Sequence, residues 1–523
     1  MSFLDPAFLF SFLPITLLLF ALAGRMYGPS GGCAVLILAS LVFCLPYGWP
    51  FFAVATASAV VNQIAFAALV RPSNLERARL RRQIFIGTLM FNFGLLIAIK
   101  YAALFEAVPG ATPLFAVISS AIPITISFFT FQRTVMIFDA YQKRPETMEF
   151  SAGTLSDHLR LGAFSLMFAN LVIGPIAYIS EIGRQLKSST FGRLRIADMG
   201  IALTMIVIGL AKKILLAEPL DTSVVSPIFA PANAHQEMMP VEVVMGMVGF
   251  YAQLYFDFSG YSDIAIGIAR LFGLELPINF NSPLRACGVV DFWKRWHITL
   301  TRVIARLLFT PLAVTGTRFA IKHGLRGNRF KLSTSWLPLL VNFEVIGLWH
   351  GAKWTYVAFG LYQGVWFILE TEVRLSSRWR EFAKRTSGNF RLRAGQILMF
   401  APMVVSFAIF RSKSMKDFSH LMGNLGHDWL AVLHKPWGEA LNIPRAATLL
   451  VIAFAVIWLC PNVYEFLHNA KPGIMTWTVP STTPKWMRFV WRPTLIWAAL
   501  TMMLGFVVIA SLSVSTPFVY GGF

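Results

Sequence analysis

The sequence predicts an all-α polytopic membrane protein, and three observations support this fold class. Of the 523 residues, 56% are hydrophobic and 13% are charged, whereas soluble proteins carry roughly 25% charged residues. The mean hydropathy is +0.63. Apolar runs of about 20 residues, the length that crosses a bilayer as a helix, recur from one end of the chain to the other. We therefore expect about 11 to 13 transmembrane helices, together with re-entrant or interfacial helices.

The apolar segments define the expected helices in chain order. The first lacks a preceding basic region and an evident cleavage site, so we interpret it as a retained helix and not as a signal peptide. No low-complexity linker or internal repeat divides the chain, and we treat 1–523 as a single membrane domain. The expected segments are 7–24, 32–48, 51–70, 84–105, 114–138, 158–180, 197–217, 241–256, 298–314, 335–352, 354–370, 394–410, 447–467 and 490–512.

The distribution of positive charge predicts the orientation. The net charge of +20 comes from 45 basic and 25 acidic residues, and the basic side chains concentrate in the loops 71–82, 183–195, 317–331 and 374–393. Short loops rich in Lys and Arg face the cytoplasm and its anionic leaflet. Three apolar segments precede the first basic loop, which places the N-terminus outside the cytoplasm. This pattern explains the charge through the lipid bilayer, and we expect no nucleic-acid partner.

The basic segment 74–83 (NLERARLRRQ) has two interpretations. It is only weakly apolar, so it lies on the membrane surface or extends the next helix inward. A solvated run of charge is the simpler interpretation. The sharper alternative is a docking patch for a carrier protein.

A polar block at 255–263 (YFDFSGYSD) separates two apolar stretches. Irregular backbone at membrane depth must be buried in protein or line a water-filled cavity. Gly260 permits either a break in the helix or a close approach of another backbone. The block therefore predicts a channel lined by Asp257, Ser259, Tyr261 and Asp263, or else a hydrogen-bonded helix break without chemistry.

Two further blocks follow at 276–283 (LPINFNSP) and 291–301 (DFWKRWHITLT). The prolines and asparagines of the first exclude a regular spanning helix, so we expect a structured loop that includes Asn279. Trp293, Trp296 and the adjacent basic pair are typical of a membrane interface. In that case His297 is one more interfacial polar residue; in the alternative it is an active-site imidazole.

His350 is the most informative residue, because it lies in a long apolar run from 336 to 360. An ionisable side chain at membrane depth is costly and marks a functional site by default, and histidine titrates near neutral pH. Glu344 lies about 120° round a helix from it and need not be its partner. Trp349 and Asn342 on the same segment are candidates to line the substrate channel. A buried histidine that is merely hydrogen-bonded is the simpler alternative.

Several other chemistries find no support in the sequence. The four cysteines are scattered, and the histidines lack the spacing of a zinc site, so we expect no metal and no permanently bound cofactor. There is no glycine-rich phosphate loop and no Gly-x-Ser-x-Gly elbow.

Taken together, the blocks resemble the membrane-bound O-acyltransferase family, in its bacterial branch of alginate O-acetylation and teichoic acid D-alanyl transfer proteins. The resemblance rests on YFDFSGYSDIAIGIARLFG at 255–273, LPINFNSP at 276–283, DFWKRWHITLT at 291–301 and GLWHGAKW at 347–354. It extends to FLFSFLP at 8–14, ISFFTFQ at 126–132, LVIGPI at 171–176, GLAKKILLAE at 209–218, AIFRSKSMKDF at 408–418 and the final PFVYGGF. The motif-bearing core spans about 120–370.

The resemblance implies transfer of an acyl group from a thioester to a hydroxyl, in a ring of helices around a thinned central channel. It makes His350 the catalytic residue and His297 the second histidine. We expect His350 to act as general base and His297 to orient the donor or stabilise the oxyanion. The donor would be acyl-CoA or an acyl carrier protein on the cytoplasmic side, and the acceptor a polysaccharide or an extracytoplasmic transfer partner protein at the bacterial inner membrane.

The chain also departs from the family pattern. The family carries an Arg-Asp pair and an aromatic residue a few positions after its first histidine, where this chain has Ala305, Arg306 and Leu307. O-acetylation of a bacterial polysaccharide is the preferred function, and exopolysaccharide, alginate-like and cellulose-like acceptors are all open. The alternatives are D-alanyl transfer to teichoic acid, a transporter for a glycan or lipid-linked intermediate, and a non-catalytic scaffold.

Overall fold

The computed structural model describes residues 2–101, 126–150, 153–230, 237–430, 440–475 and 489–512. These residues form helices joined by loops. Within these ranges the only extended pairing is an isolated bridge between Pro277 and Ile474. The predicted all-α class is confirmed. The terminal PFVYGGF motif and residues 114–125 of the predicted segment 114–138 lie outside the described residues.

The helices of the described residues vary from single turns to more than eight turns. The longer ones are α1 (Leu13–Cys44), α2 (Trp49–Val70), α3 (Ala78–Lys100), α6 (Ile126–Tyr141), α8 (Leu155–Leu166), α10 (Ile179–Lys187), α11 (Ile196–Ala211), α14 (Pro240–Leu271), α17 (Thr310–Lys322), α19 (Leu337–His350), α20 (Trp354–Leu375), α21 (Ser377–Arg385), α22 (Gly388–Arg411), α23 (Met415–Gly423), α25 (Ile443–Leu459) and α27 (Leu495–Ala510). The short ones used below are η4 (Lys212–Ala217), α15 (Val289–Trp293), α16 (Ile298–Ile304), η8 (Ala305–Phe309), α18 (Gly327–Lys331) and α26 (Val463–Phe466).

Seven helical stretches in the described residues are long and apolar enough to cross a membrane, and α25 and α27 are shorter apolar helices. The first stretch runs from Phe8 to Tyr47 and contains the predicted segments 7–24 and 32–48. Those segments meet at Gly28, whose φ of 64° interrupts the helix just before Pro29. A glycine adopts this left-handed conformation without steric cost. The protein is thus a multi-pass membrane protein.

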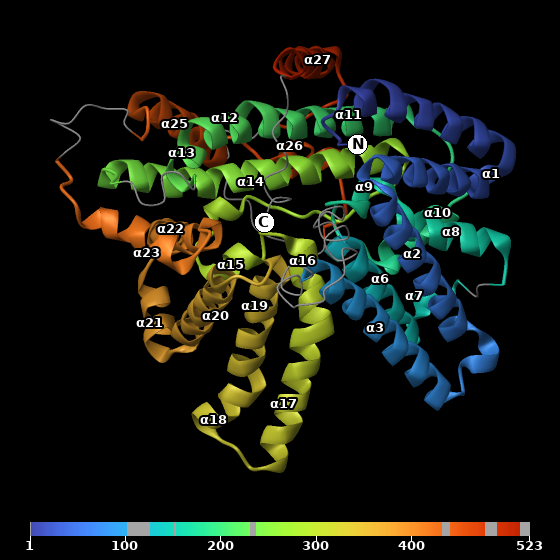
Figure 1. Ribbon diagram of the computed structural model, residues 1–523, viewed down its shortest axis with the longest axis horizontal. Coiled ribbons are helices and arrows are strands. Elements are labelled where there is room, and N and C mark those ends of the chain that lie inside the picture. Colours follow the sequence, from blue (N-terminus) through green and yellow to red (C-terminus); the bar gives the residue numbers. More distant parts are fainter. Residues whose placement is uncertain are drawn as a thin grey trace, which may run out of the picture.

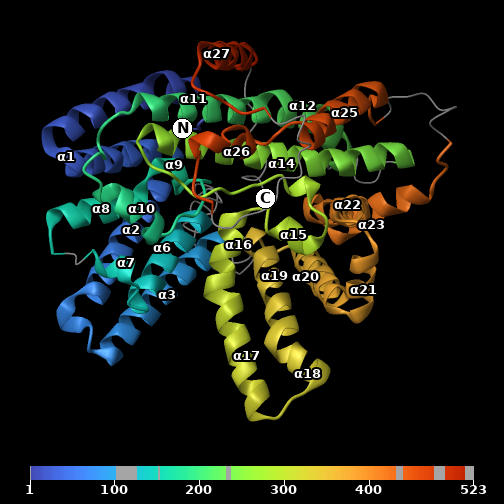
Figure 2. The same cartoon turned by 180° about the vertical axis from the view of Figure 1, so that it is seen from behind.

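The helices gather into groups around the middle of the molecule (Figure 1). α11 and α14 run side by side across the upper part, and the pair α17 and α19 projects below them. α2, α3 and α6 pack together on one side, and α20 and α22 on the other, as the reverse view also shows (Figure 2). The short helices α15 and α16 lie between these groups (Figure 1).

The polar block 255–263 forms regular helix in the middle of α14, a single helix of 32 residues. The predicted break is therefore wrong. The alternative role of Gly260 is confirmed, because a Cβ built on it would lie 2.7 Å from the carbonyl oxygen of Gly209 on α11. Small residues let two helices approach this closely in a membrane. The polar side chains of α14 are satisfied by a neighbouring helix instead of by a break, as described below.

Residues 78–83 of the basic segment 74–83 form the first turns of α3, and residues 74–77 precede that helix. The arginines of this segment do not share one environment. Arg77 and Arg79 are exposed, whereas Arg81 is buried and donates to the backbone oxygens of Leu69, Ala140 and Tyr141. The hydrogen bonds of Arg81 thus join α3 to α2 and α6. The interpretation as a solvated run of charge applies only to the neighbouring arginines.

The predicted loop at 276–283 is confirmed, and a distant part of the chain supports it. Ile278 N–H donates to the carbonyl of Ile474 at 3.0 Å, and Ile474 N–H donates to the carbonyl of Leu276 at 2.9 Å. The Asn462 amide donates to Asn281 Oδ1 and Ser282 Oγ, both at 2.8 Å. The segment 460–475, which follows α25, therefore holds this loop in place.

Candidate active site

His297 lies at the junction between the loop and α16, in an unusual backbone conformation. Its φ and ψ are 42° and 51°, in the left-handed region, directly before the first residue of α16. A non-glycine residue in this region is uncommon and persists only where its surroundings enforce it. The side chain is 1% exposed. The loop and the helix together hold the imidazole inside the protein.

Asn279 fixes the tautomer of His297. Its Oδ1 accepts from the Thr299 backbone N–H at 3.3 Å and from the Thr299 hydroxyl at 2.9 Å. Because a backbone N–H can only donate, this atom is the carbonyl oxygen of the amide. The Nδ1 of His297, 3.1 Å from the same oxygen, must therefore donate its hydrogen. In a neutral imidazole the lone pair then resides on Nε2.

His350 is the last residue of α19, and it is 8% exposed. Figure 1 shows α19 returning from the projecting tip formed by α17 and α18 toward the middle of the molecule. Gly351 ends the helix with a φ of 149°, and its N–H donates to the carbonyl of Leu348. The helix thus delivers His350 into the central region.

The structure brings the two histidines, 53 residues apart in the sequence, to the same indole ring. The ring centroid of Trp349 lies 4.6 Å from that of His350 and 6.0 Å from that of His297. The two imidazoles are close enough to interact electrostatically. His297, Trp349 and His350, together with Asn279, are the predicted site residues that meet in one place, and we call these four the histidine cluster.

Aromatic side chains that the sequence analysis did not select enclose the histidine cluster. Phe258 meets His297 edge to face at 4.8 Å, and Phe128 stacks against it at 5.9 Å. Phe410 meets His350 edge to face at 4.7 Å, and Tyr356 lies 5.9 Å from it. Each of these residues lies in or beside a motif quoted above, so their positions were marked, but a phenylalanine in an apolar run carries no signal of its own.

Lys100 is the ionisable residue that the sequence analysis missed. It ends α3, and its Nζ lies 5.1 Å from the centre of the Trp349 ring. It is also close enough to interact electrostatically with His350. The Tyr101 hydroxyl donates to the carbonyl of Leu348 at 2.7 Å, which ties the end of α3 to the end of α19. A lysine at the end of an apolar segment is typical of an interfacial anchor, which explains the omission.

Asp257 and Asp263 flank α14 residues that contact the histidine cluster, Phe258 and Ser262, and both acids form buried ion pairs. The Nζ of Lys213 is 2.8 Å from Asp257, and the Nζ of Lys212 is 2.6 Å from Asp263. The Tyr464 hydroxyl also donates to Asp263 at 2.9 Å. Both lysines belong to η4, which continues α11. These contacts give the two acids a role in joining η4, α14 and α26; their predicted role in the substrate channel stays a prediction.

The other predicted channel residues are buried in varied surroundings. Trp293 donates to Gln363 at 3.0 Å, and Trp296 packs on Phe292 and Phe407, so the interfacial interpretation of these tryptophans is wrong. Their exposure is 4% and 5%. The remaining predicted residues are Tyr261, which stacks on Phe3 at 5.0 Å, and Ser259 and Asn342, whose Oγ and Oδ1 are buried without a hydrogen bond to any described residue.

Arg306, at the departure from the family pattern, also has a defined partner. It forms an ion pair with Asp139 of α6, which is 2% exposed, and its guanidinium lies 5.1 Å from the Tyr178 ring centre. The neighbouring Arg302 pairs with Glu181 and lies 4.2 Å from the same ring. Asp139, the acid that pairs with Arg306, thus comes from α6.

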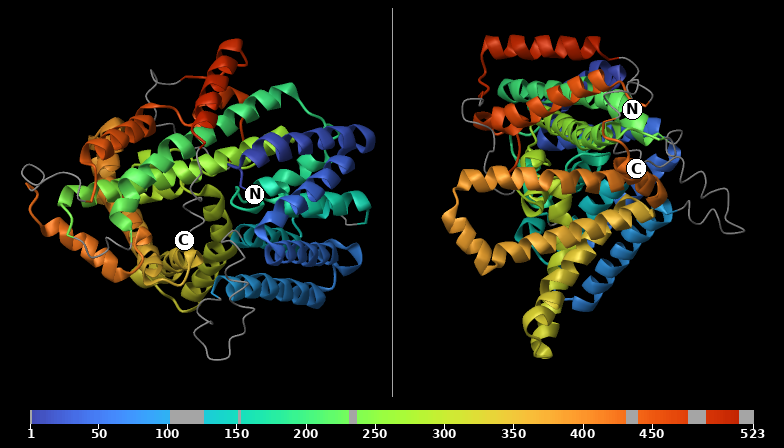
Figure 3. Two further views of the ribbon diagram at one scale, coloured as in Figure 1. Left: turned by 45° about the horizontal axis from the view of Figure 1, so that its top comes forward. Right: turned by 90° about the vertical axis from the view of Figure 1, so that its left-hand side faces the viewer.

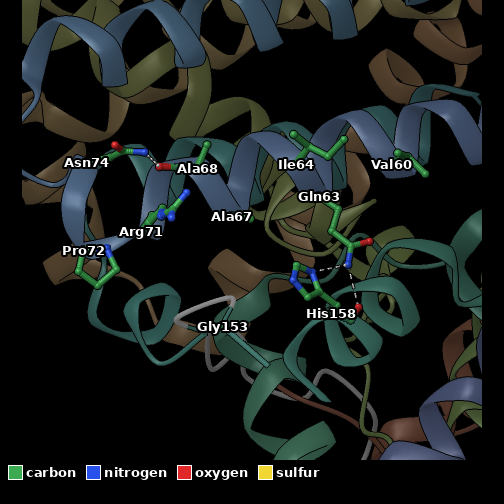
Figure 4. Close-up of a pocket in the computed structure, with 10 residues that line it drawn as sticks. All are labelled: Val60, Gln63, Ile64, Ala67, Ala68, Arg71, Pro72, Asn74, Gly153 and His158. Atoms are coloured by element: carbon green, nitrogen blue, oxygen red, sulfur yellow. Dashed lines mark hydrogen bonds between the residues drawn. The ribbon is translucent and has the colours of Figure 1, made fainter. Parts of the chain in front are cut away.

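One open groove in the described structure is separate from the histidine cluster. It has a volume of about 650 Å³ and lies along α2 near the start of α8 (Figure 4). Its lining contains neither His297 nor His350. Within the described ranges, no three His, Cys, Asp or Glu side chains lie close enough together to hold a metal ion.

Comparison with known proteins identifies related chains. Residues 80–409 match the model of the membrane-bound O-acyltransferase family. A peptidoglycan O-acetyltransferase of Helicobacter pylori is 30% identical over 468 residues, which cover 84% of this chain and 83% of that protein.

Two further relatives are more distant. A probable alginate O-acetylase of Pseudomonas fluorescens is 28% identical, over 87% of this chain and 82% of its own length. A teichoic acid D-alanyltransferase of Streptococcus thermophilus is 28% identical, over 47% of this chain and 55% of its own length.

Proposed function

This chain belongs to the membrane-bound O-acyltransferase family, and we propose that it transfers an acetyl group from a cytoplasmic thioester to a hydroxyl of an extracytoplasmic polysaccharide. The protein is an acyltransferase of the membrane. The observation that carries the proposal is the convergence of His297 and His350 on the indole of Trp349. Relatives named for O-acetylation match over most of this chain, which supports acetyl as the acyl group.

The chemistry requires a hydroxyl to become nucleophilic beside a thioester carbonyl. His350 takes the hydroxyl proton as the oxygen attacks, and then returns a proton to the leaving thiolate. General base catalysis of this kind contributes roughly 10² to 10⁴ in rate. The aromatic side chains of Phe128, Tyr356 and Phe410 exclude bulk water, which would otherwise hydrolyse the thioester.

The hydrogen bond from His297 to Asn279 sharpens the role of the second histidine. With Nδ1 donating to Asn279, Nε2 of the neutral ring presents a lone pair to the site. His297 would then accept a hydrogen bond from the incoming hydroxyl or from the donor amide and orient that substrate. Donation to an oxyanion by His297 would require a second proton on the ring.

The donor and the setting complete the proposal. Acyl-CoA or an acyl-loaded carrier protein would deliver the group as a substrate, with no permanently bound cofactor. The basic loops 71–82, 183–195, 317–331 and 374–393 would face the cytoplasm of the bacterial inner membrane, with the N-terminus outside. A glycan or a transfer partner protein would receive the group on the opposite side.

The test uses membranes that contain wild-type, His350→Ala, His297→Ala and His323→Ala protein. Acetyl-CoA and an acetylated carrier protein are supplied in parallel, with de-O-acetylated peptidoglycan or exopolysaccharide as acceptor, and ester formation is measured by mass spectrometry. We expect His350→Ala to lose about 10² to 10⁴ in rate. The exposed His323, on the projecting tip, is the control and should be silent.

Full ester formation by a well-expressed His350→Ala protein would refute the catalytic assignment. Transfer of D-alanine in place of acetate would change the acyl group and leave the histidine chemistry intact. Movement of glycan across vesicles without ester formation would support a transporter.

A further inference from the structure

We propose that the Lys100 ammonium stabilises the negative charge that develops on the thioester carbonyl during acyl transfer. This inference rests on the proposed function and adds a catalytic residue to it. Lys100 lies beside Trp349, the ring on which both histidines converge, and it approaches from a different helix. It therefore brings a cation to the same ring that both histidines contact.

The bonding of Lys100 differs from that of the other buried lysines. Lys212 and Lys213 each lie within 3 Å of a carboxylate, at 2.6 and 2.8 Å. The Nζ of Lys100 is buried, and no described residue accepts a hydrogen bond from it. The face of Trp349 attracts a cation but occupies none of its three N–H donors. These donors are available to a substrate oxygen.

The chemistry of the step creates an acceptor for these donors. As the hydroxyl oxygen bonds to the thioester carbon, the carbonyl π electrons move onto oxygen and the hydroxyl proton moves to His350. Collapse of this intermediate re-forms the carbonyl and breaks the carbon–sulfur bond, and the thiolate takes the proton back. At this depth the negative charge of the oxyanion and the positive charges of the imidazolium and the ammonium stabilise one another, whereas each charge alone would be costly.

The nearby side chains of His297 and Tyr101 do not supply this positive charge. His297 commits its Nδ1 hydrogen to Asn279, so its Nε2 accepts in the neutral ring. The Tyr101 hydroxyl commits its hydrogen to Leu348. That same contact fixes the end of α3 against α19 and so holds Lys100 at Trp349.

The experiment compares Lys100→Met, Lys100→Arg and the control Lys322→Met in the acetyl-transfer assay. Lys322 ends α17 at the exposed tip. Removal of one oxyanion-stabilising donor costs roughly 10² to 10³ in kcat. We expect that loss for Lys100→Met, with a donor KM within about threefold of wild type, and at least tenfold recovery in Lys100→Arg, which keeps the charge.

Three outcomes would overturn the inference: full activity of Lys100→Met, equal losses in the Met and Arg variants, or an effect confined to the donor KM. Thermal unfolding separates catalysis from folding, since removal of a buried cation that lacks a carboxylate should leave the protein equally stable or more so. If His350→Ala is inactive and Lys100→Met is active, only this inference fails. If His350→Ala is also active, the proposed function fails.

A second, independent observation concerns the groove along α2, and we infer that it binds an anionic phospholipid. Val60, Ile64, Ala67, Ala68 and Arg71 recur at helical spacing on one face of α2 and line the groove. Val60 and Ile64 are 49% and 65% exposed on a membrane-spanning helix, where the surrounding solvent is lipid. An apolar wall that ends in an arginine matches an acyl chain joined to a phosphate.

Donors line the groove at two places, with Arg71 at one end and Gln63 and His158 beside Ile64 (Figure 4). The Arg71 side chain forms no hydrogen bond or ion pair with any described residue, and Figure 4 shows it on the same helix as Gln63, which contacts His158. Gln63 Nε2 lies 3.4 Å from His158 Nδ1, so Nδ1 accepts and Nε2 carries the hydrogen. The lining contains no acidic residue. The exposed Arg77 and Arg79 follow closely in the chain, and such basic runs attract anionic head groups.

The test measures lipid binding to purified wild-type, Arg71→Gln, Ile64→Trp and Arg79→Gln protein by native mass spectrometry and thermal shift. Arg79 is an exposed arginine outside the lining and serves as the matched control. Phosphatidylglycerol, phosphatidylcholine and free glycerol 3-phosphate are the probes. We expect phosphatidylglycerol to bind wild type best and Arg71→Gln about fivefold more weakly.

Ile64→Trp should weaken the binding of both phospholipids, because the larger side chain fills the apolar part of the groove. Arg79→Gln should bind each lipid as tightly as wild type. Equal losses in Arg71→Gln and Arg79→Gln would indicate diffuse attraction to the basic run and overturn the site. If glycerol 3-phosphate bound as tightly as phosphatidylglycerol, the acyl chain would contribute nothing to binding and the phospholipid assignment would be wrong.

Discussion

The interface between α14 and η4 and the histidine cluster both bury charge at membrane depth, but they use it in opposite ways. At the interface, Asp257 and Asp263 of α14 each meet a lysine of η4, and Gly260 closely approaches Gly209 of α11, the helix that η4 continues. At the histidine cluster, Lys100 Nζ lies over the indole of Trp349, and no described residue accepts a hydrogen bond from it. A charge with a fixed partner holds helices together, whereas a charge without one is available to a substrate.

The largest expected effect comes from breaking a pair at the interface. Lys213→Met leaves Asp257 buried without its counter-ion, which costs about 3–5 kcal/mol of stability. The free energy of unfolding in mixed micelles measures this loss. The double variant Lys213→Met/Asp257→Leu should regain most of it, because neither charge then remains. Equal stability of the single variant and wild type would show that this pair does not hold the helices together.

The next effect concerns the approach of α11 and α14. Gly260→Leu forces a side chain against the carbonyl of Gly209, and overpacking of this kind costs about 1–3 kcal/mol. Gly94→Ala on α3 is the matched control, because nothing lies within 4 Å of its Cβ position, and alanine favours a helix. Thermal unfolding should therefore shift in opposite directions for the two variants. A Gly260→Leu protein as stable as wild type would mean that the two backbones can separate freely.

Substitutions in the histidine cluster should lower the rate of acyl transfer more than they lower the stability of the protein. Asn279→Ala removes the acceptor that fixes the tautomer of His297, and misplacement of a catalytic group lowers the rate by about 10- to 100-fold. Turnover should fall, while the KM of the donor changes less. Asn279→Asp keeps an acceptor for Nδ1 and should be the more active of the two. Equal turnover of the two variants would contradict the proposed role of this hydrogen bond.

The smallest expected effect is at the contact between α3 and α19. Tyr101→Phe removes one hydrogen bond to Leu348, worth about 0.5–1.5 kcal/mol. Because this bond positions Lys100, turnover should fall severalfold even though the fold is retained. Tyr27→Phe, on an exposed residue of α1, is the control. A loss of stability without any change in turnover would show that this hydrogen bond does not position Lys100.

The sequence predicted the fold class and singled out His350 because both depend on local pattern, whereas His297 was selected through the resemblance; the catalytic roles of both histidines stay predictions. Apolar runs of spanning length identify helices, and an imidazole inside such a run is conspicuous. The break predicted in 255–263 failed for a different reason. Its acids are paired with Lys212 and Lys213, more than 40 positions earlier. A polar side chain can remain in a regular membrane helix when another helix satisfies it, and sequence spacing does not show that partner.

The same limit explains what was missed in the histidine cluster. Lys100 lies near the end of the predicted segment 84–105, where lysine is common at an interface, and only the folded chain places it against Trp349. The tryptophans at 293 and 296 show the converse error. Their composition is typical of an interface, yet both are buried, and the yellow-green part of the chain that contains them lies in the interior of the molecule in the rotated views (Figure 3).

The loop that presents His297 depends on residues near the end of the chain. Asn462 and Ile474 hold positions 276–282, although the family match ends at residue 409. During synthesis, His350 and Lys100 are therefore inserted well before the segment that fixes the His297 loop has left the ribosome. The last segment to be made therefore sets the time at which the His297 loop gains its full support, and a nascent chain that ends before residue 462 lacks these contacts.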